Sequence, residues 1–189
     1  MILQLDGYHA VGFSQGGLFI RGLAQRCPSP KIHNLVSIGG PQQGVYGLPK
    51  CLGEDHTLCD YARRLLNYGA YIGWIQRMLV QAQYWHDPLA QEEFEAKSLY
   101  LADINNEGPL KNTTYRDNLA ALDNLVLVKF TEDTIVDPKE SEWFGWFSPV
   151  DHSTLLSLRD TKMYMDDWIG LRSLDESGKL HLLSVEVGN

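Results

Sequence analysis

The sequence predicts an α/β fold built on a mostly parallel sheet, and three observations carry this prediction. Two apolar runs, at residues 8–13 and 32–38, flank a segment with helical periodicity. Short turns join these three segments. A third apolar run, LVLVKF at residues 125–130, comes late in the chain. A strand, a helix and a strand in this order indicate a right-handed crossover between parallel strands.

The first helix is expected over residues 16–26, directly after the first strand. The CPSP sequence at 27–30 ends this helix. Its apolar residues recur at helical spacing and are Phe19, Ile20, Leu23 and Ala24. The strand at 32–38 is rich in β-branched residues and stops at Gly39-Gly40-Pro41. Further strands are expected at 162–164 and 179–187.

Residues 40–122 predict a helical insertion between two strands of the sheet. The segment opens with a turn-rich loop, and a helical pattern then runs over 60–84, where Gly69 and Gly73 divide it. More helix is expected at 88–96 and 114–122. Insertions of this size are usually functional, as lids or binding walls. The predicted organisation is therefore a core of residues 1–39 and 123–189 and an insertion domain at 40–122.

Composition excludes several classes of protein. With 189 residues, 44% of them hydrophobic and 21% charged, the chain is most simply one globular unit. A net charge of −8 argues against binding to nucleic acid, which needs a cationic face. No run of about 18 apolar residues predicts a membrane span. The first residues, MILQLDGYHA, have neither the basic nor the apolar region of a signal peptide.

Residues 12–16 form a Gly-x-Ser-x-Gly motif at the junction between the first strand and the first helix. Such a turn strains the serine backbone and presents its hydroxyl above the sheet at a helix N-terminus. We therefore interpret Ser14 as a nucleophile, with Gly12 and Gly16 leaving room for strand and helix. The amide of Gln15 would be one oxyanion-hole donor. The alternative is a glycine-rich loop with a surface serine.

A serine nucleophile requires a base and an orienting acid, in the chain order serine, acid, histidine for this strand–turn–helix arrangement. Asp133 comes three residues after the strand at 125–130, and Asp137 is its rival. We favour Asp133, because Asp137 precedes Pro138 and is typical of a turn.

No histidine has the position expected of the base. His9, His33, His56 and His86 precede the acid, His152 comes too early, and His181 lies inside a predicted strand. We expect the base to lie outside this chain. The histidines also lack zinc-ligand spacing, so no metal or cofactor is expected.

Two further features bear on the cellular setting. Cys51 and Cys59 flank a short polar loop, so their spacing is compatible with a disulfide but does not establish one, and Cys27 is left over. Asn112-Thr113-Thr114 is the one N-glycosylation sequon.

With these residues assembled, the sequence closely resembles the palmitoyl-protein thioesterases, specifically the type-one lysosomal enzymes. The stretches that carry the resemblance are GFSQGG (12–17), QRCPSP (25–30), VQAQYWHDP (80–88), LADIN (101–105) and IVDPKESEWFG (135–145). Each is longer and more idiosyncratic than the Gly-x-Ser-x-Gly motif.

The resemblance implies an α/β-hydrolase fold that removes long-chain fatty acyl groups from cysteine residues of S-palmitoylated proteins, and that accepts palmitoyl-CoA. Ser14 and Asp133 match the nucleophile and the acid of this family, and Gln15 matches its oxyanion-hole residue. The insertion matches a second domain that forms an apolar groove, for which Trp85, Leu79 and Val80 are candidate lining residues. Their alternative role is ordinary helix packing.

The resemblance also implies several features beyond the site. Cys51 and Cys59 match a family disulfide, Cys27 matches a cysteine with an upstream partner, and Asn112 matches a glycosylation site. Localisation is then expected to be lysosomal, or the protein secreted. In the family, several strands precede the serine and the histidine follows the last strand seen here. The chain therefore looks like the middle and late part of such an enzyme, and we expect it to be inactive alone. The alternative is a catalytically inactive truncated isoform or fragment that acts at most as a lipid- or partner-binding module.

Overall fold

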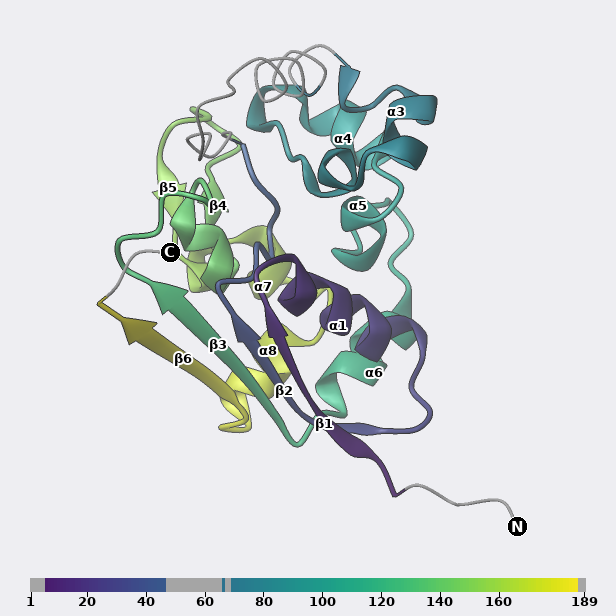
Figure 1. Cartoon of the computed structure of the whole chain (residues 1–189), viewed down its shortest axis with the longest axis vertical. Helices are drawn as coiled ribbons and strands as arrows, with labels where there is room; N and C mark the ends of the chain where they lie inside the picture. The colour runs from purple at the N-terminus through teal and green to yellow at the C-terminus, as the bar shows by residue number, and fades with distance from the viewer. Residues whose placement is uncertain (1–5, 47–65, 67–68, 187–189) are drawn as a thin grey trace, which may run out of the picture.

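The computed structural model describes residues 6–46, 66 and 69–186. Its centre is a four-stranded sheet in the order β1-β2-β3-β6, shown in Figure 1. These strands are β1 (Tyr8–Phe13), β2 (Ile32–Ile38), β3 (Asn124–Phe130) and β6 (Leu180–Val185). All three pairs are parallel, with Val36 of β2 opposite both Val11 of β1 and Val126 of β3. The predicted α/β class is therefore confirmed, and these four strands lie where apolar runs predicted them.

Helices cover one face of this sheet and enclose the first of two hydrophobic clusters. They are α1 (Gln15–Arg26), α6 (Thr113–Ala120), α7 (Lys162–Met165) and α8 (Leu171–Glu176), and Figure 1 shows α8 behind the strands. Alternate residues of the strands point into this cluster, including Leu35 of β2 and Leu125 and Leu127 of β3. Burial of one face of each strand is what the apolar alternation predicts.

The segment between β2 and α6 forms a second cluster above the carboxyl ends of the strands (Figure 1). Its described elements are α3 (Gly73–Met78), η1 (Val80–Tyr84), η2 (Pro88–Ala90), α4 (Gln91–Lys97) and α5 (Leu101–Ile104). Phe94, Leu101 and Ile104 are fully buried there. Leu18 of α1 also belongs to this cluster, so α1, whose Ala24 packs in the first cluster, contacts both hydrophobic clusters. Although α6 lies within residues 40–122, its Leu119 packs into the first cluster.

The strand predicted at 162–164 is wrong, because these residues form α7. The Thr161 side chain caps this helix by accepting a hydrogen bond from the Tyr164 amide, and such a cap favours a helical start. The prediction also missed a short antiparallel pair, β4 (Trp146–Phe147) with β5 (Leu155–Leu156), and the helical turns η3 (Lys139–Trp143) and η4 (Leu158–Asp160). No described helix has both the length and the apolar character needed to cross a bilayer.

The buried face of α1 also differs from the expectation. Phe19 is 62% exposed, whereas Arg21 and Gln25 are buried. Arg21 donates from Nη1 to Gln25 Oε1 (3.3 Å) and the Ile104 carbonyl (3.2 Å). Its Nη2 donates to the Gln42 carbonyl (2.9 Å) and to Asn105 Oδ1 (2.8 Å). Burial lowers the pKa of Arg21 to about 9, and its bonds tie α1 to α5 of the inserted segment.

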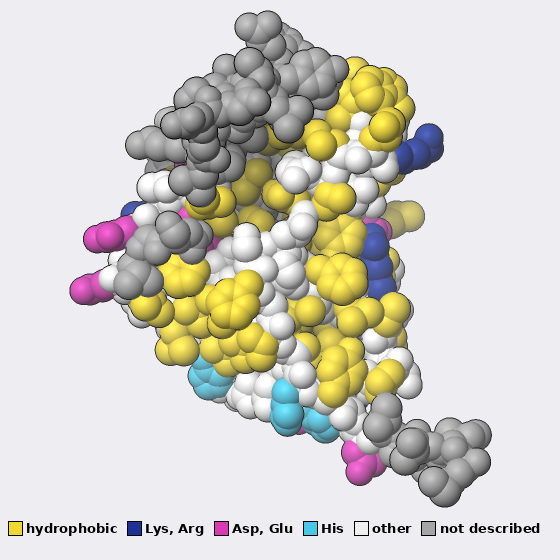
Figure 2. Space-filling model, in the orientation of Figure 1, with side chains coloured by type: hydrophobic (Ala, Val, Ile, Leu, Met, Phe, Trp, Pro, Cys, Tyr) yellow, Lys and Arg dark blue, Asp and Glu magenta, His cyan; other side chains and the backbone are white. Residues whose placement is uncertain are grey.

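The other face of the sheet is largely uncovered by the described residues. Val11 and Phe13 of β1 and Leu183 and Val185 of β6 are exposed on it, and Figure 2 shows hydrophobic side chains gathered over the strands. Histidine side chains lie along its lower edge in the same view. Within the described sheet, β1 is an edge strand.

Candidate active site

Ser14 occupies a sharp turn between the last residue of β1 and the first residue of α1. Its backbone angles, φ 48° and ψ −125°, lie in a region that non-glycine residues rarely adopt. Two hydrogen bonds hold this conformation: the Ser14 amide donates to the Ile38 carbonyl (2.8 Å), and the Gly17 amide donates to the Ser14 carbonyl (2.9 Å). The strain expected of a nucleophile elbow is therefore present at the serine that the motif singles out.

Close approach between β1 and α1 makes this turn possible. A Cβ atom at Gly12 would lie 2.5 Å from the carbonyl carbon and oxygen of Gly16, so only glycine fits there. One at Gly17 would lie 2.1 Å from Ser37 Oγ, whereas one at Gly16 would meet nothing within 4 Å. The close packing of α1 therefore requires glycine at positions 12 and 17. The motif had suggested positions 12 and 16, but Gly16 has space for a side chain.

The Ser14 hydroxyl is available for chemistry. Ser14 is the N-cap residue of α1, yet its side chain makes no capping hydrogen bond, and the residue is exposed. Gln15 is the first residue of the helix, where a backbone N–H has no intrahelical acceptor. Its amide is thus suited to a developing oxyanion, which the N-terminal end of the helix dipole also favours.

Asp133 lies in a tight turn after β3, where its amide donates to the Phe130 carbonyl (3.3 Å). It is 9% exposed. Its Oδ1 accepts hydrogen bonds from the amides of Ile135 (2.6 Å) and Val136 (3.1 Å). Backbone donors of this kind fix the orientation of a carboxylate. Asp137, the rival, is exposed, and its carbonyl accepts from the Tyr46 amide (2.8 Å). The assignment of the acid to Asp133 stays a prediction.

Ser14 and Asp133 both lie at the carboxyl-terminal end of the sheet. Ser14 follows β1 and Asp133 follows β3, with β2 between them. Neighbouring strands are about 4.8 Å apart, so the two groups are separated by about 10 Å of sheet. An imidazole between the two side chains is the group that would connect them.

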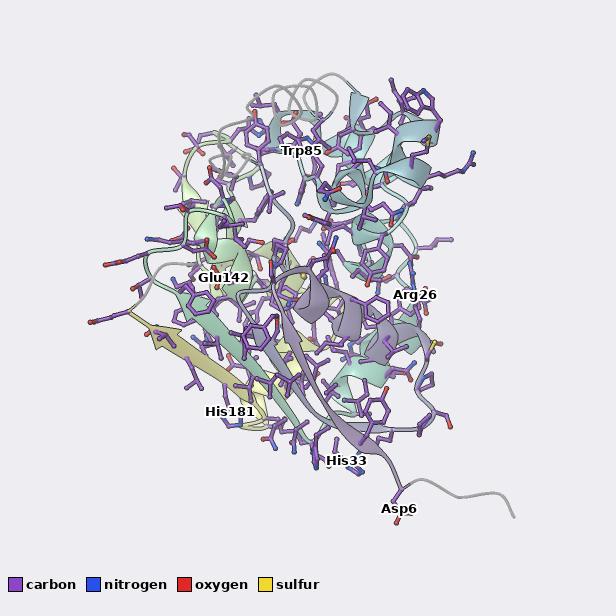
Figure 3. The ribbon with its side chains drawn as sticks, viewed as in Figure 1. Asp6, Arg26, His33, Trp85, Glu142 and His181 are labelled. Carbon is purple, nitrogen blue, oxygen red and sulfur yellow. The ribbon has the colours of Figure 1, made fainter. Side chains whose placement is uncertain are left out.

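The described histidines do not occupy this position. His181 bonds to Asn124 Oδ1 (2.9 Å) and His9 bonds to Asn34 (2.9 Å), both at the opposite end of the sheet. Figure 3 shows His181 and His33 together at that end. His86 is buried between Phe94 and Trp146, and burial lowers its pKa to about 4. His152 lies in the exposed loop between β4 and β5.

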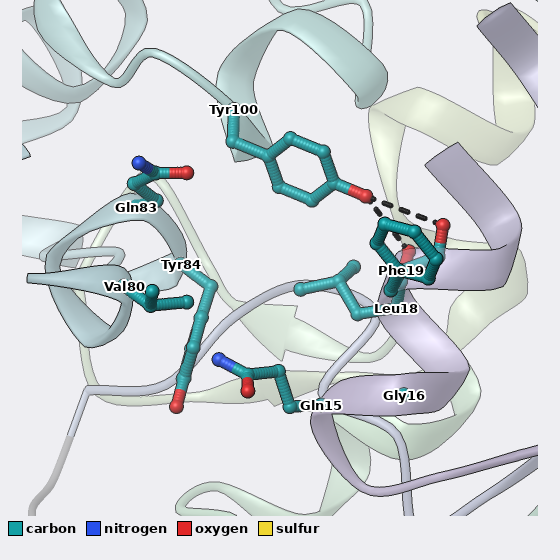
Figure 4. A pocket seen from close by; sticks show the side chains of 8 residues that line it. All are labelled: Gln15, Gly16, Leu18, Phe19, Val80, Gln83, Tyr84 and Tyr100. Atoms are coloured by element: carbon teal, nitrogen blue, oxygen red, sulfur yellow. Dashed lines mark hydrogen bonds between the residues drawn. The ribbon is translucent and has the colours of Figure 1, made fainter. Parts of the chain in front are cut away.

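An apolar groove of about 440 Å³ opens beside the start of α1 (Figure 4). One wall comes from the start of α1 and the other from η1 and the start of α5; the lining residues are Gln15, Gly16, Leu18, Phe19, Val80, Gln83, Tyr84 and Tyr100. The Tyr100 hydroxyl donates to the Leu18 carbonyl (3.1 Å) and thereby joins the walls. The volume falls within the usual 300–1,000 Å³ of small-molecule sites.

The three predicted groove residues have different positions. Val80 lines the groove, while Leu79 packs against the second hydrophobic cluster. Trp85 is buried in that cluster and is labelled there in Figure 3; it lines a smaller cavity beside Tyr71. Sequence reasoning missed the α1 side of the groove. The one available signal was Phe19, which we named only for its helical spacing in α1.

Cys51 and Cys59 lie outside the described residues. Cys27, the cysteine that the structure describes, is exposed and unbridged. Asn112 is the exposed N-cap of α6, and its Oδ1 accepts from the amides of Thr114 (3.0 Å) and Tyr115 (3.4 Å). The cap uses the side-chain oxygen, whereas N-glycosylation modifies the side-chain nitrogen.

The chain is similar to known proteins along most of its length. The palmitoyl protein thioesterase family model matches residues 2–188. Palmitoyl-protein thioesterase 1 of Caenorhabditis elegans is 51% identical over 181 residues, which cover 96% of this chain and 60% of the relative. Palmitoyl-protein thioesterase 3 of Dictyostelium discoideum is 38% identical, with 93% and 58% covered. Lysosomal thioesterase PPT2-B of Xenopus laevis is 29% identical, with 96% and 62% covered. The chain thus spans about 60% of the length of these relatives, and it belongs to the palmitoyl protein thioesterase family.

Proposed function

We propose that the protein containing this chain hydrolyses long-chain fatty acyl thioesters, with Ser14 as nucleophile. The observation that carries the proposal is the strained backbone of Ser14, which directly precedes Gln15 and Gly16 of the apolar groove. The groove supplies an apolar environment for an acyl chain, and the side chain of Ser14 makes no capping hydrogen bond to α1. S-palmitoylated proteins and palmitoyl-CoA are substrates of this chemistry, and the relatives' names support the same class.

The mechanism follows from the positions of the groups. Ser14 Oγ attacks the thioester carbonyl while a histidine takes its proton, and the amide of Gln15 stabilises the oxyanion. The carbon–sulfur bond then breaks, and the cysteine sulfur leaves with the proton returned by the imidazolium. Water, deprotonated by the same histidine, releases the fatty acid from Ser14. Asp133 orients the imidazole and stabilises its charge. This chemistry needs no cofactor.

We further propose that these 189 residues alone give no turnover. The support is the position of the described histidines, since His9, His33 and His181 lie at the end of the sheet away from Ser14. A chain without its base keeps only the contributions of binding and of the oxyanion hole. A second function, lipid binding without catalysis, is favoured for this chain by the same observation.

A lysosomal location is proposed from two supports. Relatives are named lysosomal thioesterases, and Asn112 presents its side-chain nitrogen on an exposed helix start. Glycosylation at Asn112 and a Cys51–Cys59 disulfide belong to the same proposal, since both form in the secretory route. A mass shift on glycosidase treatment that Asn112→Gln abolishes would test it.

The deciding experiment is thiol release from palmitoyl-CoA by the full-length protein, beside Ser14→Ala. We expect turnover that Ser14→Ala removes, and none from the 189-residue chain. An oxygen ester of the same acyl length separates a thioesterase from a general esterase, which would hydrolyse both at comparable rates. Full activity of Ser14→Ala would refute the nucleophile assignment. Turnover by the 189-residue chain would show that a histidine within it acts as base.

A further inference from the structure

Glu142 is a buried carboxyl group beside the predicted acid of the site. It lies in η3, is 1% exposed and is labelled in Figure 3 near the carboxyl end of β3. Its Oε2 accepts a hydrogen bond from the amide of Phe130, the last residue of β3 (3.0 Å). Its side chain is also hydrogen-bonded to Asp133. Two carboxyl groups therefore share one enclosed position after this strand.

The second oxygen of Glu142 favours the protonated form of this carboxyl group. Oε1 receives no hydrogen bond from any donor in the described part of the chain. An ionised carboxylate is acceptor-only, so this buried oxygen would be unsatisfied and would face the negative charge of Asp133. A proton on Oε1 removes both penalties, because the O–H donates to Asp133 and one of the two carboxyl groups becomes neutral.

Other charged groups near Glu142 do not reverse this preference. Burial and the Asp133 carboxylate raise the pKa of Glu142 to about 8, although Lys129 opposes the shift. The Lys129 ammonium lies over the Trp143 ring, 4.2 Å from its centroid. The proton is therefore expected to reside on Glu142 rather than on Asp133, whose Oδ1 accepts two backbone hydrogen bonds.

We propose that Glu142 is a positioning residue for Asp133: its protonated carboxyl group donates a hydrogen bond that, with the Ile135 and Val136 amides, fixes the Asp133 carboxylate toward the imidazole. This inference rests on the proposed function, in which Asp133 is the acid of the triad. The same carboxyl group accepts from the Phe130 amide and so ties Asp133 to the end of β3. Loss of either bond lets the carboxylate turn away from the base.

Substitution distinguishes a protonated donor from an ionised or merely space-filling group. Glu142→Gln keeps an N–H donor and a carbonyl acceptor in the same shape, so activity should stay within about threefold of wild type. Glu142→Ala removes both bonds and should lower kcat for palmitoyl-CoA by about 100-fold, with KM changed less than threefold, since a misplacement near 1 Å costs about that much. Glu140→Gln, on the same helical turn, is the matched control and should change neither value.

A direct measurement covers the case in which Glu142→Ala fails to fold. Carbon-13 NMR of the glutamate carboxyl groups of the full-length protein should show one signal, absent in Glu142→Gln, that titrates near pH 8. Asp133→Asn should move its midpoint down. An ordinary midpoint near 4.5 would overturn the proposal, as would equal loss of kcat in Glu142→Gln and Glu142→Ala. Retained turnover in Ser14→Ala would instead refute the proposed function, and the NMR result would be unaffected by that failure.

Discussion

Replacing Gly12 by alanine should damage both the fold and the nucleophile, because the added Cβ would meet backbone atoms that cannot rotate away. It would lie 2.5 Å from the carbonyl carbon and oxygen of Gly16 and 2.6 Å from the Gly17 nitrogen. Ordinary contact begins near 3.4 Å, so β1 and α1 must separate by about 0.9 Å. Overpacking of this kind typically costs about 1–3 kcal/mol, and we expect the upper value. A shift near 1 Å at Ser14 should also lower kcat by about 100-fold.

Gly16→Ala is the matched comparison within the same motif. Its Cβ meets nothing within 4 Å, and alanine in a helix is about 1 kcal/mol more favourable than glycine. Urea denaturation of the full-length protein should therefore place Gly12→Ala about 3 kcal/mol below wild type and Gly16→Ala at or above it. Equal stability of the two variants would refute the close-approach argument.

Three further predictions follow from individual side chains. Arg21→Met leaves the Gln42 carbonyl and Asn105 Oδ1 without their donor, so the free energy of unfolding should fall by about 2–5 kcal/mol. An unchanged urea midpoint would mean that the cost of burying the Arg21 charge equals the stabilisation from its hydrogen bonds. Phe19→Asp places a charge in the groove at an exposed position, so kcat/KM should fall about 10- to 100-fold for palmitoyl thioesters but not for acetyl thioesters. An equal fall in kcat/KM for both substrates would contradict an acyl groove. The raised pKa of Glu142, about 8 against an ordinary 4.5, means that the folded state holds a proton that the unfolded state releases. Stability should therefore decline as pH rises from about 4.5 to 8, and a wild-type decline no steeper than that of Glu142→Gln would show otherwise.

The strands of the fold were predictable because their signal is local. β1, β2, β3 and β6 are runs of apolar or β-branched residues stopped by turns. The error at 162–164 arose because a run of three residues has no period, and the Thr161 cap decides in favour of a helix. The buried face of α1 was mispredicted for a different reason. The buried guanidinium of Arg21 donates hydrogen bonds to Gln42, Ile104 and Asn105, which are distant in sequence. The periodicity within α1 gives no information about these partners, so the burial of Arg21 could not be predicted from it.

The site was predictable only in part, for the same reason. The motif at 12–16 and the place of Asp133 after a strand are local patterns, so Ser14, Gln15 and Asp133 could be named as candidates. The groove is formed by two segments about sixty residues apart, and its α1 wall includes residues that periodicity assigned to the core. No sequence motif marks Glu142 as a site residue, because its proposed role depends on its contact with Asp133 in the folded structure.

The hydrogen bonds of Arg21 have a consequence for how substrate preference can change during evolution. Helix α1, which begins directly after Ser14, is held to α5, the element that follows Tyr100 of the groove wall. Moving the inserted segment to widen the groove would therefore pull on the helix that carries Ser14, so gains in substrate range by that route would reduce turnover. Substitutions at solvent-exposed groove positions such as Phe19 and Val80 avoid this conflict. We expect variation in acyl-chain preference among natural relatives to concentrate at those positions.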